Sequence, residues 1–419
     1  MEGVLLVTIK LKTERGGWPL EDIVNEMEEL VSSCGAKILE SMTYICERPT
    51  PNFFIGRGKA EEIAMLAQEL GVQAVIFSRD LSGTQQRNLE EVIGRKTIDR
   101  TQLILDIFAR HAHSPEGKMQ VELAQLEYLL PRLVGKGIIL SRLGGGIGTR
   151  GPGEQKLEVD RRRIRKKIDG LKLDLKQVMF HRKTIRKKRK DNMLPAIALV
   201  GYTNAGKSTL LNALTGSAQT VAGSLFTTLD PLSRGLVLPN GENIVLTDTV
   251  GFLHELPHYL IEAFKGTLEE VAEADLLIHV IDASHPRVYE HYRAVFTVLE
   301  DLGIKDKPII TALNKRDLLD DNLWLSHLNR DFAGSVLISA RLKQNLGELL
   351  NKIQDNFSGR MACRTILIPH KRMDLVDLFY REGKVEKIDY LQKGIKIRVI
   401  LPNIIFDKLL HSNDIEEVS

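Results

Sequence analysis

Cysteine is scarce in this 419-residue chain, and long apolar runs are missing from it. The three cysteines, Cys34, Cys46 and Cys363, are odd in number, lie far apart and never fall in a C-x-x-C spacing. Neither a disulfide framework nor a zinc site is therefore indicated, and a reduced cytosolic environment fits. No run of 18 apolar residues occurs, so we expect no membrane-spanning helix.

The beginning of the chain also lacks the features of a secretory signal. It has no basic n-region, and its short apolar stretch alternates with polar residues, which predicts a strand. We expect a cytoplasmic protein, with peripheral membrane association left open and a monomer as the simplest state. The length and a hydrophobic content of 43 % can supply the cores of two to four domains.

Charge is distributed unevenly along the chain. The net charge is only +3, yet residues 161–190 hold 15 Lys and Arg against two acids, Asp169 and Asp174. That stretch therefore carries +13 and the remainder −10. A local block of this size indicates a polyanionic partner, and a nucleic acid is favoured. We expect no DNA partner.

The most informative motif is GYTNAGKST at 201–209, which fits G-x-x-x-x-G-K-[ST]. An apolar run at 196–200 precedes it and a helix-like stretch follows, which is the strand–loop–helix setting of a phosphate-binding loop. Backbone N–H groups there would surround phosphate oxygens while Lys207 reaches the β- and γ-phosphates. The residues expected around the nucleotide are Gly201, Tyr202, Thr203, Asn204, Ala205, Gly206, Lys207, Ser208 and Thr209.

Two later motifs extend this site. The DTVGF sequence at 248–252 ends an apolar run, so Asp248 would hold Mg²⁺ together with the Ser208 hydroxyl, and the Gly251 N–H would face the γ-phosphate. In the loop at 217–230, Thr227 or Thr228 can supply a second Mg²⁺ hydroxyl that orders when the γ-phosphate is bound.

Guanine selectivity is predicted by the sequence NKRD at 314–317. The Asp317 carboxylate can accept hydrogen bonds from guanine N1 and from the exocyclic amine, and adenine offers no such donor pair. Asn314 and Lys315 belong to the same motif, and the backbone of Ser339 and Ala340, after another apolar run, would meet the base O6. These motifs in this order define a GTPase domain that takes GTP and releases GDP.

The chain divides into four predicted domains with an α/β fold class. Strand-like and helix-like stretches alternate over 1–115, which predicts a small parallel α/β domain. A helical hairpin is expected at 116–193, the P-loop GTPase domain at 194–360 and a small α+β domain at 361–419. The GRGK sequence at 56–59 lies at a strand-to-helix turn, where it either meets a phosphate or is a tight turn with exposed charges.

Two heptad seams predict the antiparallel hairpin. Apolar residues recur at spacings of 3 and 4 over 119–133 and at spacings of 7, 4, 3, 4 and 3 over 157–178. The second helix is longer and strongly basic. The glycine-rich LGGGIGTRGPGEQ between them contains a G-x-G-x-x-G, but no βαβ unit follows, so a hairpin loop with Arg142 and Arg150 as donors fits better than a dinucleotide site.

Four segments resemble the HflX-type GTPases, a ribosome-associated family, and the likeness covers nearly the whole chain. They are 142–164, 201–215, the switch-I-like FTTLDPLSR at 226–234 and the switch-II-like stretch at 248–270. The resemblance adds Phe226 and Thr227 to the nucleotide site and places Thr228 at the family's threonine, so that Lys207, Thr228 and Gly251 carry catalysis and Ser208, Thr228 and Asp248 bind the metal.

The same resemblance implies binding to the large ribosomal subunit and its rRNA, stimulated GTP hydrolysis, and splitting or rescue of stalled ribosomes under stress. The cations assigned to that contact are Arg142, Arg150, Arg161, Arg162, Arg163, Arg165, Lys166 and Lys167. Two alternatives remain open: a ribosome- or RNA-anchored GTP switch or assembly factor that splits nothing, and an added ATP-dependent RNA remodelling by the N-terminal domain.

Phe252 stands where many GTPases have a glutamine that orients water. A phenyl ring cannot orient water, so we expect slow intrinsic turnover and a borrowed group. Asn204 resembles an asparagine that coordinates K⁺ in related GTPases. His254 and His258, near switch II, are expected to be packing or surface residues.

Overall fold

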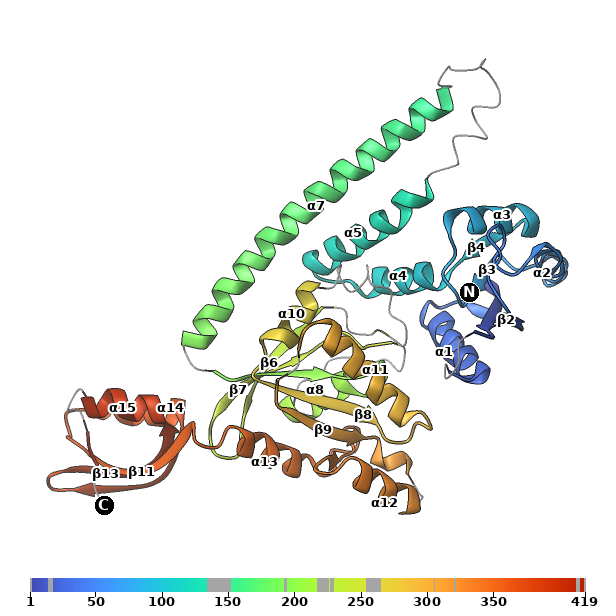
Figure 1. The fold of residues 1–419 in the computed structure, drawn as a ribbon. Helices are drawn as coiled ribbons and strands as arrows, with labels where there is room; N and C mark the ends of the chain where they lie inside the picture. The colour runs from blue at the N-terminus through green and yellow to red at the C-terminus, as the bar shows by residue number, and fades with distance from the viewer. Residues whose placement is uncertain are drawn as a thin grey trace. The chain divides into compact units, whose positions relative to one another are not determined.

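The computed structural model describes residues 2–13, 18–133, 152–191, 194–216, 226, 230–253, 265–304, 306–319, 322–411 and 415–417. These form two compact units. One contains the described residues up to 183 together with Phe226, Asp230 and residues 265–266, and the other contains the rest. Figure 1 shows the elements of each unit.

The N-terminal part of the first unit is a four-stranded parallel sheet in the order β2-β1-β3-β4. Its core joins one sheet face to helices α2 and α3 through side chains such as Val7, Phe77 and Ile63. The elements are β1 (Gly3–Leu11), α1 (Leu20–Ser33), β2 (Lys37–Cys46), α2 (Arg57–Glu69), β3 (Ala74–Phe77), α3 (Gly83–Ile93), β4 (Lys96–Ile98) and α4 (Arg100–His111).

Two long helices follow, α5 (Pro115–Arg132) and α7 (Pro152–Asp191). They run antiparallel, as Figure 1 shows, and pack through Leu123 of α5 against Ile168 and Leu171 of α7. These are heptad positions, so the predicted seams are the ones that pair.

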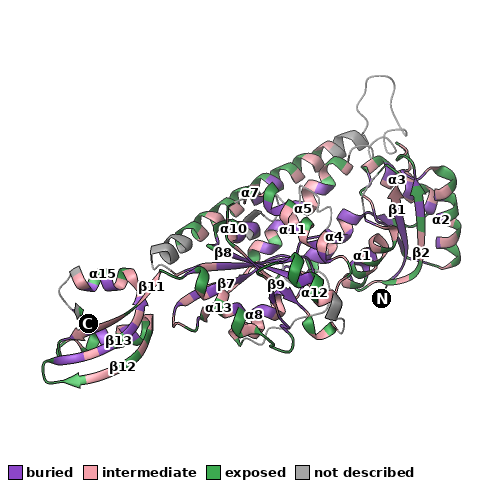
Figure 2. Ribbon diagram, turned by 60° about the horizontal axis from the view of Figure 1, so that its bottom comes forward, coloured by how far each residue is buried: buried purple, intermediate pink, exposed green. Residues whose placement is uncertain are grey.

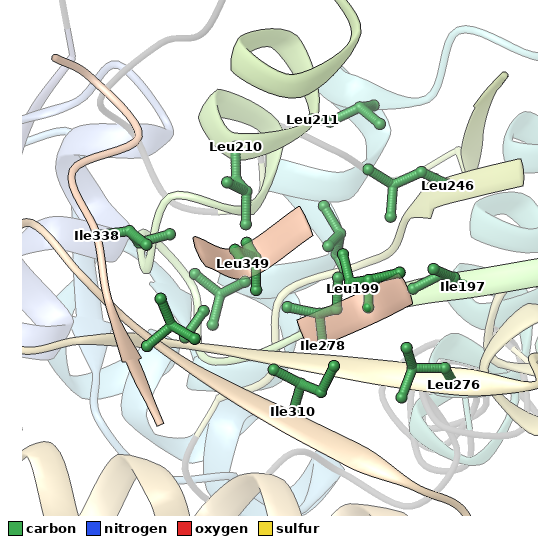
Figure 3. Close-up of a cluster of buried hydrophobic side chains, with 14 of the residues drawn as sticks. Ile197, Leu199, Leu210, Leu211, Leu246, Leu276, Ile278, Ile310, Ile338 and Leu349 are labelled. Atoms are coloured by element: carbon green, nitrogen blue, oxygen red, sulfur yellow. The ribbon is translucent and has the colours of Figure 1, made fainter. Parts of the chain in front are cut away.

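The nucleotide-binding sheet has six strands in the order β10-β9-β8-β5-β7-β6, and only β6 runs antiparallel to its neighbour. Figure 3 shows side chains of its strands meeting Leu210 and Leu211 of α8, and Figure 2 shows the buried residues gathered along its central strands. The elements are β5 (Ala196–Val200), α8 (Lys207–Thr215), β6 (Leu232–Val237), β7 (Asn243–Asp248), α10 (Lys265–Glu273), β8 (Leu276–Asp282), α11 (Val288–Asp301), β9 (Ile309–Asn314), η1 (Arg316–Leu318), α12 (Asn322–Asp331), β10 (Val336–Leu337) and α13 (Leu346–Asn356).

The C-terminal part is an antiparallel sheet in the order β12-β13-β11-β14. Two helices close its core, with Phe379 and Phe406 packed against strand residues such as Ile397. The elements are β11 (Met361–Ile368), α14 (Met373–Glu382), β12 (Lys384–Leu391), β13 (Gly394–Pro402), α15 (Asn403–His411) and β14 (Glu416–Glu417).

The predicted α/β fold class is confirmed, with a P-loop sheet, an N-terminal sheet, a helical pair and a C-terminal α+β part. Helix α2 begins at Arg57, so the cations of GRGK lie in its first turn. The helix expected over 257–271 is described only from Lys265 onward. No helix of the described residues has the length and apolarity needed to cross a bilayer.

Candidate nucleotide-binding site

Four predicted motifs meet at one edge of the six-stranded sheet. The loop at 201–206 follows β5, DTVG begins at the end of β7, NKRD begins at the end of β9, and Ser339-Ala340 follow β10. Strands β5, β7, β9 and β10 are parallel, so their carboxyl ends lie along the same edge. In open α/β sheets this edge is where ligands bind.

Lys207 opens helix α8 with its ammonium folded back over the loop. Its Nζ donates to the carbonyl oxygens of Gly201 at 3.0 Å and Tyr202 at 2.8 Å, and the side chain is buried. Burial lowers the pKa of Lys207 to about 8, although the nearby Asp248 carboxylate opposes that shift. An anionic phosphate would replace the carbonyl partners and favour the charged form.

Two glycines of the site have no room for a side chain. Gly206, the N-cap of α8, has φ +95°, and a Cβ there would lie 2.3 Å from the Asn314 amide nitrogen. A Cβ at Gly251 would lie 2.8 Å from the Cα of Thr203 and 3.1 Å from Lys207 Nζ. The backbone at both positions thus approaches its neighbours as closely as glycine allows.

Two of the three predicted magnesium ligands, Ser208 and Asp248, lie side by side. Ser208 Oγ donates to Asp248 Oδ2 at 2.6 Å, and the carboxylate is buried at the end of β7. A hydroxyl and a carboxylate oxygen form the hard donor set that Mg²⁺ takes in P-loop proteins, so the residues present fit this metal.

Phe252 ties the two phosphate-facing loops together. Its N–H donates to the Gly201 carbonyl at 3.1 Å, and its carbonyl accepts from the Thr203 N–H at 2.8 Å. The ring is 1 % exposed. Phe252 is therefore a core residue whose side chain orients no water, as its chemistry predicts.

Asn314 joins the P-loop to the loop after β10. Its amide nitrogen donates to the Ala205 carbonyl at 2.9 Å, and its amide oxygen accepts from the Ala340 N–H at 2.9 Å. The residue is 2 % exposed. Its side chain thus positions both loops, while the predicted contact of the Ser339–Ala340 backbone with guanine O6 stays a prediction.

The rest of the base-recognition motif is held by two further contacts. Ser339 Oγ donates to Asp317 Oδ1 at 2.5 Å, which orients that carboxylate. Lys315 Nζ pairs with Asp282 Oδ2 at 2.7 Å. Asp282 is the last residue of β8 and was not among the predicted site residues. A carboxylate at the end of the strand next to β9 could have indicated it.

Two histidines beside the P-loop, His291 and His279, were not among the predicted site residues. The His291 ring of α11 stacks on Tyr202 with centroids 3.9 Å apart and planes at 5°. His279 of β8 is buried, and its Nδ1 makes no hydrogen bond to any residue that the structure describes. Burial, with the Lys207 ammonium as a smaller cause, lowers the pKa of His279 to about 3, so the ring stays neutral.

Phe226 and Asn204 lie within the described residues, whereas several other predicted residues lie outside them and their roles stay predictions. Phe226 has φ +58° and is 3 % exposed, and its ring centroid lies 4.5 Å from that of Phe108 of α4. Its predicted nucleotide contact also stays a prediction. Asn204 is exposed in the P-loop with φ +60°. The residues outside are Arg142, Arg150, Thr227, Thr228, His254 and His258.

The predicted cations at 161–167 lie on α7, and most are exposed. Lys167 pairs with Glu122, Lys172 pairs with Glu127 at 2.7 Å, and Arg182 pairs with Glu116 at 2.8 Å. Acidic residues of α5 therefore neutralise part of the positive charge of residues 161–190. Counting the charges of that stretch alone did not reveal this. Within the described chain Arg162, Arg165 and Lys166 form no ion pair.

Comparisons with protein families and with solved structures give the following matches. Three protein families match parts of the chain. They are described as "GTP-binding GTPase N-terminal" over residues 21–109, "GTP-binding GTPase Middle Region" over 111–189 and "50S ribosome-binding GTPase" over 196–315. A GTP-binding protein of Sulfolobus solfataricus, solved with GDP, matches with a TM-score of 0.44 and 26 % identity, over 85 % of this chain and 98 % of that one.

A P-loop on the central strand, a serine–carboxylate pair beside it and an NKRD loop on the same edge are the parts of a P-loop GTPase, which binds and hydrolyses GTP. GTPase HflX of Caldanaerobacter subterraneus is 48 % identical over 90 % of this chain and 87 % of its own. GTPase HflX of Escherichia coli is 41 % identical over 93 % and 92 %. The chain belongs to the HflX family of GTPases.

Proposed function

We propose that this chain is a GTPase that binds the large ribosomal subunit and uses GTP binding and hydrolysis to split or rescue stalled ribosomes. The observation that carries the proposal is the occurrence, in one chain, of four nucleotide-binding motifs at one sheet edge and of exposed cations on α7. The family description of the nucleotide domain as a 50S ribosome-binding GTPase supports the choice of partner.

The residues at the nucleotide edge have separate tasks in this proposal. Lys207 and the backbone of 201–206 hold the phosphates, Asp317 selects guanine, and Asn314 fixes the two loops between them. Ser208 and Asp248, joined by Thr228 when GTP is bound, would hold Mg²⁺, which when bound supplies charge neutralisation at the β- and γ-phosphates. The Gly251 N–H faces the γ-phosphate.

Slow intrinsic hydrolysis follows from Phe252. Its ring is buried and its backbone N–H and C=O are both used by the P-loop, so position 252 offers nothing to an attacking water. A group supplied by the ribosome or by another part of the chain would raise turnover, as donated groups do in stimulated GTPases. A K⁺ ion bound by Asn204 is a second candidate for raising GTP turnover. Equal hydrolysis rates in K⁺ and in Na⁺ would rule it out.

Splitting is tested by light scattering of intact ribosomes mixed with the chain. With a non-hydrolysable GTP analogue we expect scattering to fall as subunits separate, and with GDP we expect no change. Co-sedimentation with large subunits is measured in parallel. Binding without splitting would favour the second candidate, a ribosome-anchored GTP switch or assembly factor, and the absence of binding would contradict both.

ATP-dependent RNA remodelling by the N-terminal part has less support. Arg57 of the GRGK turn pairs with Glu61 at 2.9 Å, and Lys59 lies over the Tyr44 ring at 3.9 Å. Both cations therefore already have partners within the chain. ATP turnover measured on a variant with Lys207→Ala, which disables the P-loop, would reveal any second nucleotide site.

A further inference from the structure

Asp230 has a set of contacts that the nucleotide site does not explain. Its Oδ2 accepts from the backbone N–H groups of Ser114 at 2.8 Å and His113 at 3.1 Å, and its carboxylate also accepts from the Ser114 hydroxyl. The residues lie 116 positions apart in sequence and belong to the same compact unit. Asp230 ends the segment that precedes β6.

Ser114 is the N-cap of α5, the first helix of the helical pair. Its Oγ accepts from the Gly117 N–H at 2.9 Å while its hydroxyl donates to Asp230. The Asp230 carboxylate therefore completes the cap of an 18-residue helix at the end where the helix dipole favours negative charge. A residue of the switch-I-like segment thus satisfies donors at the start of α5.

A second anchor lies four residues earlier. Phe226 is a non-glycine residue in the left-handed region, with φ +58°, a conformation that persists only where surroundings hold it. Its buried ring packs edge to face on Phe108 of α4. Thr228, the proposed γ-phosphate sensor, stands midway in the sequence between these two anchors.

Asp230 also connects to the metal-binding strand through the chain. Only Pro231 separates it from Leu232, the first residue of β6, and Leu232 pairs with Asp248 of β7. Phe226 and Asp230 thus contact α4 and α5, while Leu232, two residues after Asp230, pairs with β7.

We propose that Asp230, assisted by Phe226, is a positioning residue that links the switch-I segment to the N-terminus of α5, so that the nucleotide state alters the helical pair that carries the basic surface. Because the ordering of Thr228 belongs to the proposed function, this role rests on it. The contacts predict that GTP, in contrast to GDP, changes the hydrogen bonding of the first turn of α5.

Gly117 offers a sharp variant for the test. A Cβ at Gly117 would lie 2.3 Å from Asp230 Oδ1, so Gly117→Ala expels the carboxylate while favouring helix formation. Gly170→Ala on α7 is the matched control, because a Cβ there meets nothing within 4 Å. Asp230→Ala removes the same contact from the other side.

The experiment is hydrogen exchange of the backbone amides of Ser114 and of residues 116–118 in the full chain, with GDP or a non-hydrolysable GTP analogue, and with both affinities measured. We expect exchange to differ between nucleotides by about fivefold in wild type and in Gly170→Ala, a factor typical of a lost helix cap, and by less than about twofold in Gly117→Ala and Asp230→Ala.

A difference that persists in both variants would overturn the positioning role. So would equal exchange in wild type when both nucleotides bind. Failure of the nucleotides to bind at all would instead overturn the proposed function, and the positioning role with it.

Discussion

Asn314 joins the two sides of the nucleotide site through one buried side chain. Replacing it with alanine leaves the Ala205 carbonyl and the Ala340 N–H without a partner, at about 1–3 kcal/mol for each group. We expect Asn314→Ala to unfold at lower urea concentration and to bind GDP more weakly. Asn351→Ala, an exposed position of α13, is the control, and equal stability of the two variants would contradict this role.

The lowered pKa of Lys207 predicts how the stability of the nucleotide-free protein depends on pH. Its pKa is about 8 in the folded chain against an ordinary value of 10.5, so the unfolded chain binds more protons between these values. Stability of the nucleotide-free protein should therefore rise with pH from about 8 to 10.5, by up to roughly 3 kcal/mol.

Nucleotide binding should reverse that shift, because phosphate favours the ammonium. We expect GTP binding to take up more protons at pH 9 than at pH 7, where Lys207 is already charged. Calorimetry in buffers of different ionisation enthalpy measures this uptake. Equal uptake at the two pH values would show that Lys207 is charged before GTP arrives.

At the scale of elements, α7 supplies a direct comparison of two leucines. Leu171 is 8 % exposed and packs on α5, while Leu173 is 61 % exposed on the same helix. Leu171→Ala should lower the free energy of unfolding by about 2 kcal/mol, and Leu173→Ala by under about 0.5 kcal/mol. Chemical denaturation followed by circular dichroism measures both, and similar losses would mean that the helices do not pair along this seam.

Elements with strong periodicity were predictable from the sequence. The heptad seams predicted over 119–133 and 157–178 fall on α5 and α7, and the apolar run at 196–200 is β5. Helix α12 was not predicted. The apolar stretch at 236–238 alone predicts a strand there, but β6 begins at Leu232, because its pairing with β7 and not its own pattern sets that boundary.

The candidate site also contains features that were predictable from the sequence and features that were not. The position of residues that belong to a local motif, such as Lys207 and Asp317, at the sheet edge was predictable, and their roles stay predictions. The contacts of Asp282, His291 and Asp230 were not, because each depends on which distant strand or helix end the fold brings beside it. Distances along the sequence carry no information about such pairs.

At the scale of the whole molecule, the chain combines a guanine-nucleotide edge with a basic helix. The neutral variant of the basic surface is Arg162→Gln, Arg165→Gln and Lys166→Gln together, since these cations are exposed and pair with no acid in the described structure. Its matched control replaces three exposed lysines elsewhere with glutamine, Lys37, Lys371 and Lys393. Each lost phosphate contact should reduce the slope of log K against log salt by about 0.7–0.9.

The most direct test of ribosome-coupled GTP hydrolysis is GTP turnover with and without purified large ribosomal subunits, at low and high salt. We expect slow intrinsic turnover, strong stimulation by the subunit that high salt removes, and loss of that stimulation in the α7 variant but not in its control. Fast turnover that ignores the subunit would contradict both the role assigned to α7 and the consequence drawn from Phe252.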